Sequence, residues 1–303
     1  MKKILILGVN SYIGSSFQKY IEENYDGQYE IHKVSLRGDA WKKDDWSEYD
    51  SILNVTGKAH ADIGSLTEEE KQEYYAVNCD LACEAAQKAL KDGAGQYIYL
   101  SSVIVYGDSS HDGGAVHITK DTKPAPSNFY GDSKWQAEQK LRALFVDITA
   151  NNGKNNTSLA IVRPPMIYGK NSKGNFKLLV KLADKTPVFP DVKNERSMLY
   201  VENLAEFLRL LIDSRKAGLF LPQNDSYVTT AQMVSAIAEA KGKKLLLCGW
   251  MNPLVTLAKK MPGKIGGMVG KAFGSMTIEQ ELSRQEIDGY RRFGLKESVE
   301  RSV

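Results

Sequence analysis

A tyrosine and a lysine four residues apart are the side chains best suited to chemistry. Tyr130 and Lys134 lie in a segment with helical apolar spacing, so they share one face of the expected helix. Transfer of a hydride to or from a carbinol requires a group that exchanges a proton with the carbinol oxygen. A phenol with an ordinary pKa of about 10 is too weak a base at neutral pH, and a neighbouring ammonium and a positive nicotinamide would lower that pKa. Ser102, at the end of an expected strand, could bind the same oxygen.

A glycine-bearing turn follows the first expected strand. Residues 3–7 run into this turn, and a helical pattern begins directly after it. Such a turn presents free backbone N–H groups and the positive end of a helix dipole, which suit the pyrophosphate of a dinucleotide. A plain strand-to-helix turn is the alternative. Gly8 would permit the turn, and Gly14 would permit close packing of the helix. Ser11 replaces the middle glycine of the familiar fingerprint, so the backbone approaches phosphate less closely or the hydroxyl binds it.

The end of the second expected strand bears on which dinucleotide would bind. No acidic residue stands there to bind the adenosine ribose, as one does in NAD sites. The strand ends at Ser35 and Arg37 instead. Guanidinium binds phosphate bidentately, so this pair favours the 2′-phosphate of NADP, unless Arg37 is an ordinary surface charge. The expected cofactor is NAD or NADP, with a lean towards NADP.

Short apolar segments alternate with helical patterns through the first two thirds of the chain. The expected strands are 3–7, 29–35, 50–55, 96–102 and 158–163, and the expected helices are 13–24, 67–91 and 130–148. This alternation predicts an α/β fold with a Rossmann-like, doubly wound parallel sheet. Active-site residues of such sheets lie at the carboxyl ends of the strands.

The pattern changes after about residue 170. Helices are expected at 174–185, 201–213 and 230–241, separated by polar loops. We therefore expect residues 1–170 to form an NAD(P)-binding domain, to which later segments could return. Residues 171–303 would form a smaller, mostly helical substrate-binding lobe.

Composition excludes several classes of partner. The 303 residues carry 40 Lys and Arg against 37 Asp and Glu, a net charge of +3, which is too balanced to indicate a nucleic-acid partner. No segment approaches the ~18–20 consecutive apolar residues that span a bilayer, so we expect a cytoplasmic protein without stable membrane insertion. Cys79 and Cys83 lack a further ligand at metal-binding spacing, so we expect no metal.

One segment leaves two interpretations open. Trp250 to Phe273 mixes apolar residues with four lysines and four glycines. Association with a membrane surface is one interpretation. A flap or a subunit contact in the smaller lobe is the other.

Further motifs appear in the order expected of one family. They are Asn54–Gly57, Asn78, Ser101–Gly107, Tyr130–Lys134 and Arg163–Gly169. With the glycine turn, they resemble the extended short-chain dehydrogenase/reductase family, specifically its sugar-nucleotide epimerases, dehydratases and reductases. One departure is Lys170, which stands where proline commonly follows the Tyr-Gly pair.

The resemblance implies a role for each matched residue. Tyr130 would be the acid/base, Lys134 would hold the nicotinamide ribose, and Ser102 would orient the sugar hydroxyl. Gly8, Ser11, Tyr12, Ile13 and Gly14 would cradle the pyrophosphate, and Gly57 and Asn78 would line the cofactor and structure the site. Further cofactor contacts would be Val55, Thr56, Pro164 and Met166, and further substrate contacts Val103, Asn175 and Arg196. Asn175 resembles a phosphate or uracil-ribose contact and Arg196 a diphosphate clamp. A helix-start residue and a surface charge are the alternatives for these two.

The positions after Ser102 bear on the reaction. Dehydratases of the family usually carry an Asp-Glu pair there, whereas this chain has Val103 and Ile104. The resemblance therefore favours an epimerase, such as a UDP-hexose or UDP-N-acetylhexosamine 4-epimerase of surface-polysaccharide pathways. An NADPH-dependent keto-sugar-nucleotide reductase is the alternative. A non-catalytic dinucleotide-sensing or scaffold protein is the alternative of another class. Helices 67–91 and 130–148 resemble the family's dimer interface, which makes a homodimer possible.

Overall fold

The chain divides into two compact units. The computed structural model describes residues 1–59, 66–108, 115–152, 156–261, 263–284 and 287–303. The first unit comprises Met1–Gly107, Pro124–Pro164 and Leu204–Pro222, and the second comprises Asp108–Lys123, Pro165–Asn203 and Gln223–Val303. The division differs from a single boundary at residue 170: residues 204–222 return to the first unit, and residues 108–123 join the second.

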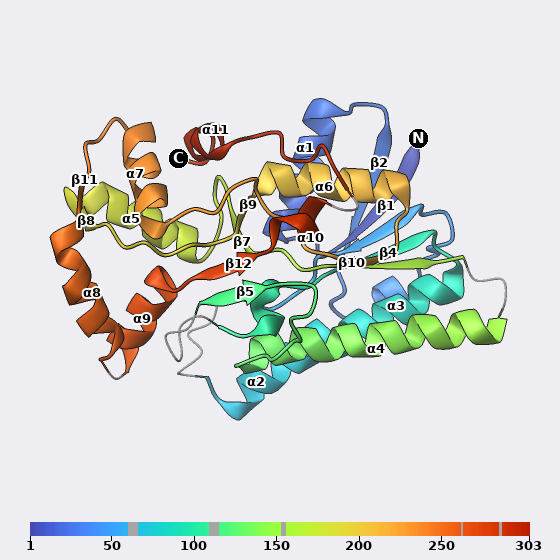
Figure 1. The fold of residues 1–303 in the computed structure, drawn as a ribbon. Coiled ribbons are helices and arrows are strands. Elements are labelled where there is room, and N and C mark those ends of the chain that lie inside the picture. Colours follow the sequence, from blue (N-terminus) through green and yellow to red (C-terminus); the bar gives the residue numbers. More distant parts are fainter. Residues whose placement is uncertain (60–65, 109–114, 153–155, 262, 285–286) are drawn as a thin grey trace. The chain divides into compact units, whose positions relative to one another are not determined.

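A six-stranded sheet forms the centre of the first unit (Figure 1). Its order is β10 (Gly218–Phe220), β6 (Ser158–Val162), β4 (Gln96–Leu100), β3 (Ser51–Asn54), β1 (Lys2–Leu7) and β2 (Tyr29–Val34). Every pair in it is parallel. Chain order runs outward from β1 in both directions, which is the doubly wound arrangement. The predicted fold class is therefore confirmed, and the five expected strands lie within a few residues of their predicted bounds.

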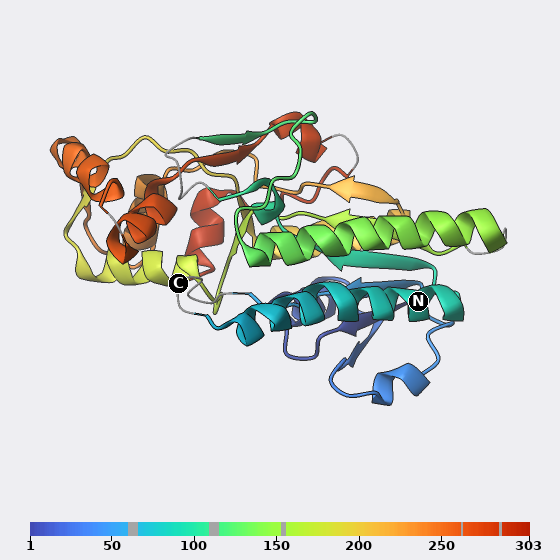
Figure 2. The ribbon, with the colours of Figure 1, turned by 90° about the horizontal axis from the view of Figure 1, so that it is seen from below.

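Helices cover both faces of this sheet (Figures 1 and 2). α1 (Tyr12–Asn24) and α6 (Val201–Ser214) lie on one face, and α3 (Leu81–Asp92) and α4 (Phe129–Asn152) lie side by side on the other. The buried cluster on the α3 side joins Leu7, Ile52 and Tyr97 of the strands to Ala86 and Leu141 of the helices. Small side chains on α3 let that helix approach the sheet closely, as efficient packing requires.

The expected helix at 67–91 is interrupted. α2 (Glu68–Tyr75) begins with a capping box, in which the Thr67 hydroxyl and the Glu70 carboxylate each accept a bond from the other residue's backbone N–H. A π-helical turn at Ala76–Asp80 then separates α2 from α3. Such turns often mark functional positions, and this one carries the buried Asn78.

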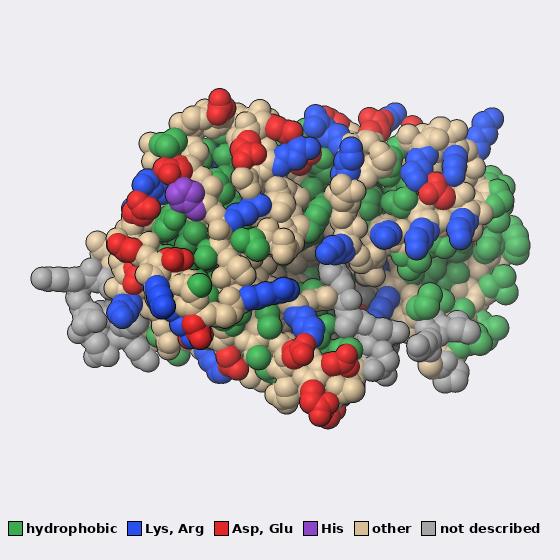
Figure 3. Space-filling model, turned by 180° about the vertical axis from the view of Figure 1, so that it is seen from behind, with side chains coloured by type: hydrophobic (Ala, Val, Ile, Leu, Met, Phe, Trp, Pro, Cys, Tyr) green, Lys and Arg blue, Asp and Glu red, His purple; other side chains and the backbone are tan. Residues whose placement is uncertain are grey.

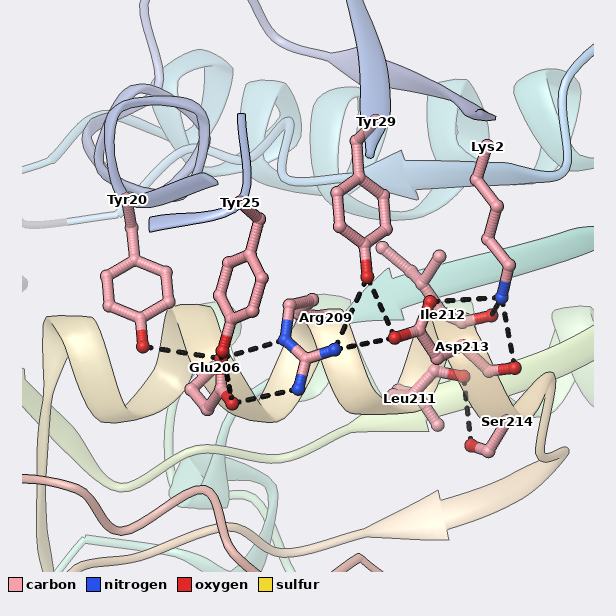
Figure 4. A network of polar contacts seen from close by, with 10 residues as sticks. All are labelled: Lys2, Tyr20, Tyr25, Tyr29, Glu206, Arg209, Leu211, Ile212, Asp213 and Ser214. Carbon is pink, nitrogen blue, oxygen red and sulfur yellow. Dashed lines mark hydrogen bonds and ion pairs between the residues drawn. The ribbon is translucent and has the colours of Figure 1, made fainter. Parts of the chain in front are cut away.

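A polar network fixes α6 in the first unit (Figure 4). The Glu206 carboxylate accepts hydrogen bonds from the phenols of Tyr20 and Tyr25. Arg209 donates to Glu206 and to Asp213, and its guanidinium lies over the Tyr25 ring. These contacts, with the pairing of β10 to β6, give the physical reason why residues 204–222 return to this unit.

The second unit combines short strands with helices. Three two-stranded parallel pairs occur: β5 (Val116–Ile118) with β12 (Met276–Ile278), β7 (Met166–Tyr168) with β9 (Met198–Tyr200), and β8 (Val188–Pro190) with β11 (Leu246–Cys248). The helices are α5 (Asn175–Lys185), α7 (Thr230–Ala240), α8 (Asn252–Lys259), α9 (Lys264–Phe273), α10 (Gln280–Arg284) and α11 (Leu295–Glu300). The sequence predicted α5 and α7 but missed the six strands, because three residues are too few to show a periodic pattern.

Candidate active site

The end of β4 places the first of the candidate residues. The N–H of Ser101 donates to the Val162 carbonyl at 2.7 Å, and the N–H of Val103 donates to the Pro164 carbonyl at 3.1 Å. A single 3₁₀ turn, Val103–Tyr106, follows, and the Ser102 hydroxyl accepts from its first free N–H group, that of Ile104. These contacts fix the chain at the carboxyl edge of the sheet, where the sequence places the site.

Tyr130 lies near Ser102, in the first turn of α4, and the Ser102 side chain acts on the pKa of its phenol. Burial raises the pKa of Tyr130 to about 12, and Ser102 lowers it in part. In the protein alone the pKa is therefore raised, and its depression by an ammonium together with a bound nicotinamide stays a prediction. Desolvation outweighs every favourable contact that the phenol makes.

Lys134 is buried one turn further along α4. Its ammonium donates to the Leu100 carbonyl at 2.9 Å and lies 4.7 Å from the centre of the Tyr99 ring. Burial lowers the pKa of Lys134 to about 8, while the nearby Glu138 carboxylate opposes that shift. Gly57 leaves room for this ammonium, because a Cβ there would lie 3.3 Å from Nζ.

Asn78 connects the helices to the loop after β3. Its side-chain oxygen accepts from the Lys58 N–H at 2.8 Å, and its amide group donates to the Lys58 carbonyl and to Ser133 Oγ. The Ser133 hydroxyl in turn donates to the Tyr130 carbonyl at 2.9 Å. Asn78 therefore ties the loop bearing Gly57 to the first turn of α4.

A buried ion pair behind these residues escaped the sequence analysis. Arg163 donates from Nε and Nη2 to the two oxygens of Glu138, at 2.8 and 2.5 Å. The Ser101 hydroxyl donates to the same carboxylate at 2.6 Å, and Arg163 also donates to the Tyr106 phenol. Glu138 has no exposed surface. Glu138 follows Lys134 by four residues, and this helical spacing was the sequence signal that could have indicated Glu138 as part of the site.

The glycine turn after β1 has the geometry that a dinucleotide requires. Gly8 adopts φ +112°, and a Cβ there would lie 3.2 Å from Thr56 Oγ1. A Cβ added to Gly14 would lie within 2.9 Å of Ile6, so Gly14 allows the close helix packing that was predicted. Thr56 Oγ1 is buried and has no hydrogen-bond partner among the described residues. A buried hydroxyl of this kind fits a site that is completed by a ligand.

Ser11 caps helix α1. Its hydroxyl accepts from the Gly14 N–H at 3.4 Å, and its own N–H donates to the Gly8 carbonyl. The hydroxyl therefore satisfies one free N–H group of the helix start, and in this structure it serves as a cap. Tyr12 and Ile13 follow as the first residues of α1, and both are partly exposed.

Beyond the turn, the expected cofactor residues lie at two strand ends. Val55 is buried and donates its N–H to the Leu7 carbonyl. Ser35 accepts from the N–H of Arg37, whose side chain is exposed and has no partner among the described residues. Val55 is thus fixed beside the glycine turn, and the guanidinium of Arg37 is free to bind an anion.

The remaining candidates divide between the two units. Pro164 is buried in the first unit, and Met166 begins β7 in the second. Asn175 is the exposed first residue of α5. Arg196 donates to the carbonyls of Lys271 and Ala272 at the end of α9, and burial lowers its pKa. Arg196 is thus a helix-capping residue in this structure rather than a free surface charge.

The described residues contain neither a cluster of metal ligands nor a membrane-spanning helix. No group of three or more His, Cys, Asp or Glu side chains there could hold a metal ion. No helix among them has the length and apolar character needed to cross a bilayer.

With this geometry established, comparison with known proteins identifies the family. A model of the NAD dependent epimerase/dehydratase family matches residues 4–220. The chain belongs to this family. Within it, the chain is 27% identical over 311 residues to a UDP-glucose 4-epimerase of Vibrio cholerae, covering 94% of this chain and 90% of the relative. It is 32% identical over 211 residues to the N-acetyl-alpha-D-glucosaminyl-diphospho-ditrans,octacis-undecaprenol 4-epimerase of Escherichia coli O157:H7, covering 68% and 60%.

Solved structures of the epimerase/dehydratase type share the fold. A UDP-N-acetylglucosamine 4-epimerase from Bacillus cereus aligns with a TM-score of 0.71 at 15% identity, covering 99% of this chain and 97% of that one. A dTDP-4-dehydrorhamnose reductase from Clostridium acetobutylicum aligns with a TM-score of 0.68 at 18% identity, covering 98% and 97%. The predicted resemblance to sugar-nucleotide epimerases and reductases is confirmed at the level of the family.

Proposed function

We propose that this protein is an NAD(P)-dependent 4-epimerase of a sugar nucleotide, either a UDP-hexose or a UDP-N-acetylhexosamine. The observation that carries the proposal is the placement of Tyr130 near Ser102 at the carboxyl edge of the sheet, one helical turn from the buried ammonium of Lys134. No acid pair follows Ser102, so the site lacks the groups that an elimination would use. The names of the Vibrio cholerae and Escherichia coli relatives, both 4-epimerases, support this choice.

A dinucleotide fits the residues present. The positive φ of Gly8, the unpartnered hydroxyl of Thr56 and the free Arg37 side chain are the groups that would hold it. When bound, it supplies the acceptor and then the donor of the hydride from C4 of the sugar. Tyr130 would take the O4 proton as C4 is oxidised and return it after the keto sugar has turned over. Ser102 would hold the same oxygen beside the phenol.

Lys134 gives the proposed dinucleotide site a pH dependence. The pKa of Lys134 is lowered from its ordinary 10.5 to about 8, so the ammonium is present below that pH and is lost above it. If the ammonium binds the nicotinamide ribose, dinucleotide affinity is constant near neutrality and falls by up to about tenfold per pH unit above pH 8. Calorimetric titration of the dinucleotide across this range measures the effect.

The Lys134→Met variant provides the test of that assignment. It should bind the dinucleotide more weakly at pH 7 and show no fall above pH 8. Lys140→Met is the matched control, because Lys140 lies on the same helix but is exposed and pairs with Asp80. If dinucleotide affinity still falls above pH 8 in Lys134→Met as it does in the parent, the titrating group is not Lys134.

The lean towards NADP rests on Arg37. Its exposed guanidinium could bind a 2′-phosphate bidentately, an interaction of about 1.5–3 kcal/mol. Arg37→Ala should therefore weaken binding of NADPH by roughly 10- to 100-fold and leave that of NADH within about twofold. Dissociation constants for both dinucleotides decide this. Equal losses for both would show that Arg37 does not discriminate between them.

Incubation of the purified protein with sugar nucleotides tests the proposed reaction. UDP-glucose, UDP-galactose and their N-acetyl forms are supplied with and without added NAD or NADPH, and the products are separated by chromatography. Polyprenyl-diphosphate-linked N-acetylglucosamine is included because the Escherichia coli relative is named for it. Interconversion without net dinucleotide consumption is expected. Stoichiometric NADPH consumption with a 4-keto sugar would instead identify the alternative, a keto-sugar-nucleotide reductase.

Four related expectations belong to this proposal. A cytoplasmic location and a role in surface-polysaccharide synthesis rest on the sequence, and Asn175 and Arg196 are the residues proposed to bind the substrate diphosphate. A homodimer formed through helices 67–91 and 130–148 would be tested by the solution mass. The non-catalytic alternative, a dinucleotide sensor or scaffold, needs neither Tyr130 nor Lys134, yet both are present.

A further inference from the structure

Large apolar side chains are exposed together in the second unit. Leu254 and Leu257 on α8 are 56% and 66% exposed, and Trp250, in the 3₁₀ turn Gly249–Met251 directly before α8, is 72% exposed. Leu246 on β11 and Met268 on α9, which packs against α8, are exposed as well. We call these five residues the α8 face. Figure 3 shows hydrophobic side chains gathered on part of the second unit's surface, with Lys and Arg side chains beside them. Monomeric proteins rarely leave so many large apolar side chains exposed together.

The charge of this segment differs from that of the rest of the chain. Residues 240–278 contain seven lysines and no Arg, Asp or Glu: Lys241, Lys243, Lys244, Lys259, Lys260, Lys264 and Lys271. The other residues carry 33 Lys and Arg against 37 Asp and Glu, a net charge of −4. Lys241 and Lys243 pair with Asp184, whereas Lys244 and Lys260 are exposed without a partner among the described residues. Residues 240–278 therefore carry an excess of positive charge, of which Asp184 neutralises part, and Lys260, unpaired among the described residues, directly follows α8.

We propose that the α8 face docks onto the surface of a bilayer that contains anionic lipids. Apolar side chains flanked by lysines are the composition that binds such surfaces, and tryptophan favours the interface between headgroups and acyl chains. The lysines would be attracted by the negative surface potential. This binding is peripheral, since no described helix is suited to crossing a membrane.

A second copy of the chain is a poorer occupant. A two-fold contact through the α8 face would bring two copies of the same lysine-rich segment together, and residues 240–278 provide no carboxylate to neutralise them. Like charges brought together at an interface oppose association. Anionic lipids neutralise the lysines instead. The inference concerns this surface alone, so its failure would leave the proposed reaction untouched.

Sedimentation with phospholipid vesicles tests the proposal. The full chain should bind vesicles of phosphatidylcholine with phosphatidylglycerol, bind pure phosphatidylcholine more weakly, and lose affinity at high salt. Lys244→Glu with Lys260→Glu should weaken binding by more than fivefold per lysine, because each reversal removes an attraction and adds a repulsion. Leu254→Ser with Leu257→Ser should weaken it at least tenfold.

Matched variants elsewhere serve as controls. Lys120→Glu with Lys123→Glu changes two exposed lysines outside the segment, and Val146→Ser removes an exposed apolar side chain from α4. These controls should bind vesicles as the parent does. Binding that is equal in the α8-face variants and the controls would overturn the proposal. A parent protein that does not bind anionic vesicles would also overturn the proposal. This includes a parent that forms a dimer which the α8-face variants convert into a monomer.

The tryptophans allow a second test that needs no variant. Trp41 and Trp46 are buried and Trp135 is partly buried, all three in the first unit, whereas Trp250 is largely exposed. Adding anionic vesicles should shift the tryptophan emission to shorter wavelength, and brominated acyl chains should quench the shifted component. An emission spectrum that anionic vesicles leave unchanged would also contradict docking through Trp250.

Discussion

Tyr130→Phe is expected to lower kcat for sugar interconversion by about 10²–10⁴-fold, the usual contribution of a positioned acid or base. The variant keeps the ring, which contacts the ring of Tyr74 with centroids 6.2 Å apart. It removes only the hydroxyl on whose pKa the Ser102 side chain acts. KM and dinucleotide affinity should therefore change little, so that the loss falls on kcat.

Tyr75→Phe is the control for this prediction. The Tyr75 phenol is partly exposed on α2 and donates to Asp132, so the same atom is deleted from a neighbouring tyrosine outside the proposed chemistry. Its kcat should stay within about twofold of the parent. If Tyr130→Phe retained full turnover, the phenol would not be the acid/base. If the parent shows no measurable turnover and Tyr130→Phe leaves its biological function unaffected, the result would favour the non-catalytic dinucleotide sensor.

Glu138→Ala is expected to cost about 3–5 kcal/mol of the free energy of unfolding, because it leaves the buried Arg163 charge without its partner. Urea unfolding measures this loss. A second effect follows from the nearby ammonium. The Glu138 carboxylate raises the pKa of Lys134, so in Glu138→Gln the fall in dinucleotide affinity should begin below pH 8. The shift is towards acid, since the ammonium loses a favourable charge.

Two variants show whether the buried pair itself is responsible. Glu138→Leu combined with Arg163→Met removes both charges, and stability should recover most of the loss. Lys140→Gln breaks an exposed pair with Asp80 and should cost no more than about 1 kcal/mol. A Glu138→Ala protein as stable as Lys140→Gln would show that the pair contributes nothing beyond a surface contact.

Patterns among residues close in sequence were enough to predict much of the fold and part of the candidate site in the first unit. The Tyr130 and Lys134 pair was predictable because a spacing of four places two side chains on one helix face. The turn at Gly8 was predictable because a strand, a glycine and a helix start are adjacent in sequence. The family match from residue 4 to 220 confirms that these signals identify the family.

Contacts between distant segments were not predictable in the same way. Arg163 and Glu138 are 25 residues apart, and only the folded sheet brings them together. The return of residues 204–222 depends on the pairing of β10 with β6 and on Glu206, which accepts from Tyr20 of α1. The raised pKa of Tyr130 in the protein alone was not predictable either, because desolvation depends on packing that no sequence pattern shows.

The fate of the hydrogen on C4 tests the proposed epimerisation most directly. A UDP-hexose or UDP-N-acetylhexosamine that the protein interconverts is labelled with deuterium at C4 and incubated in ordinary water, and mass spectrometry follows the label. Transient oxidation at C4 with Tyr130 handling only the O4 proton predicts an epimer that keeps its deuterium. Loss of the deuterium to solvent, or no epimer from any of the sugar nucleotides, would contradict it.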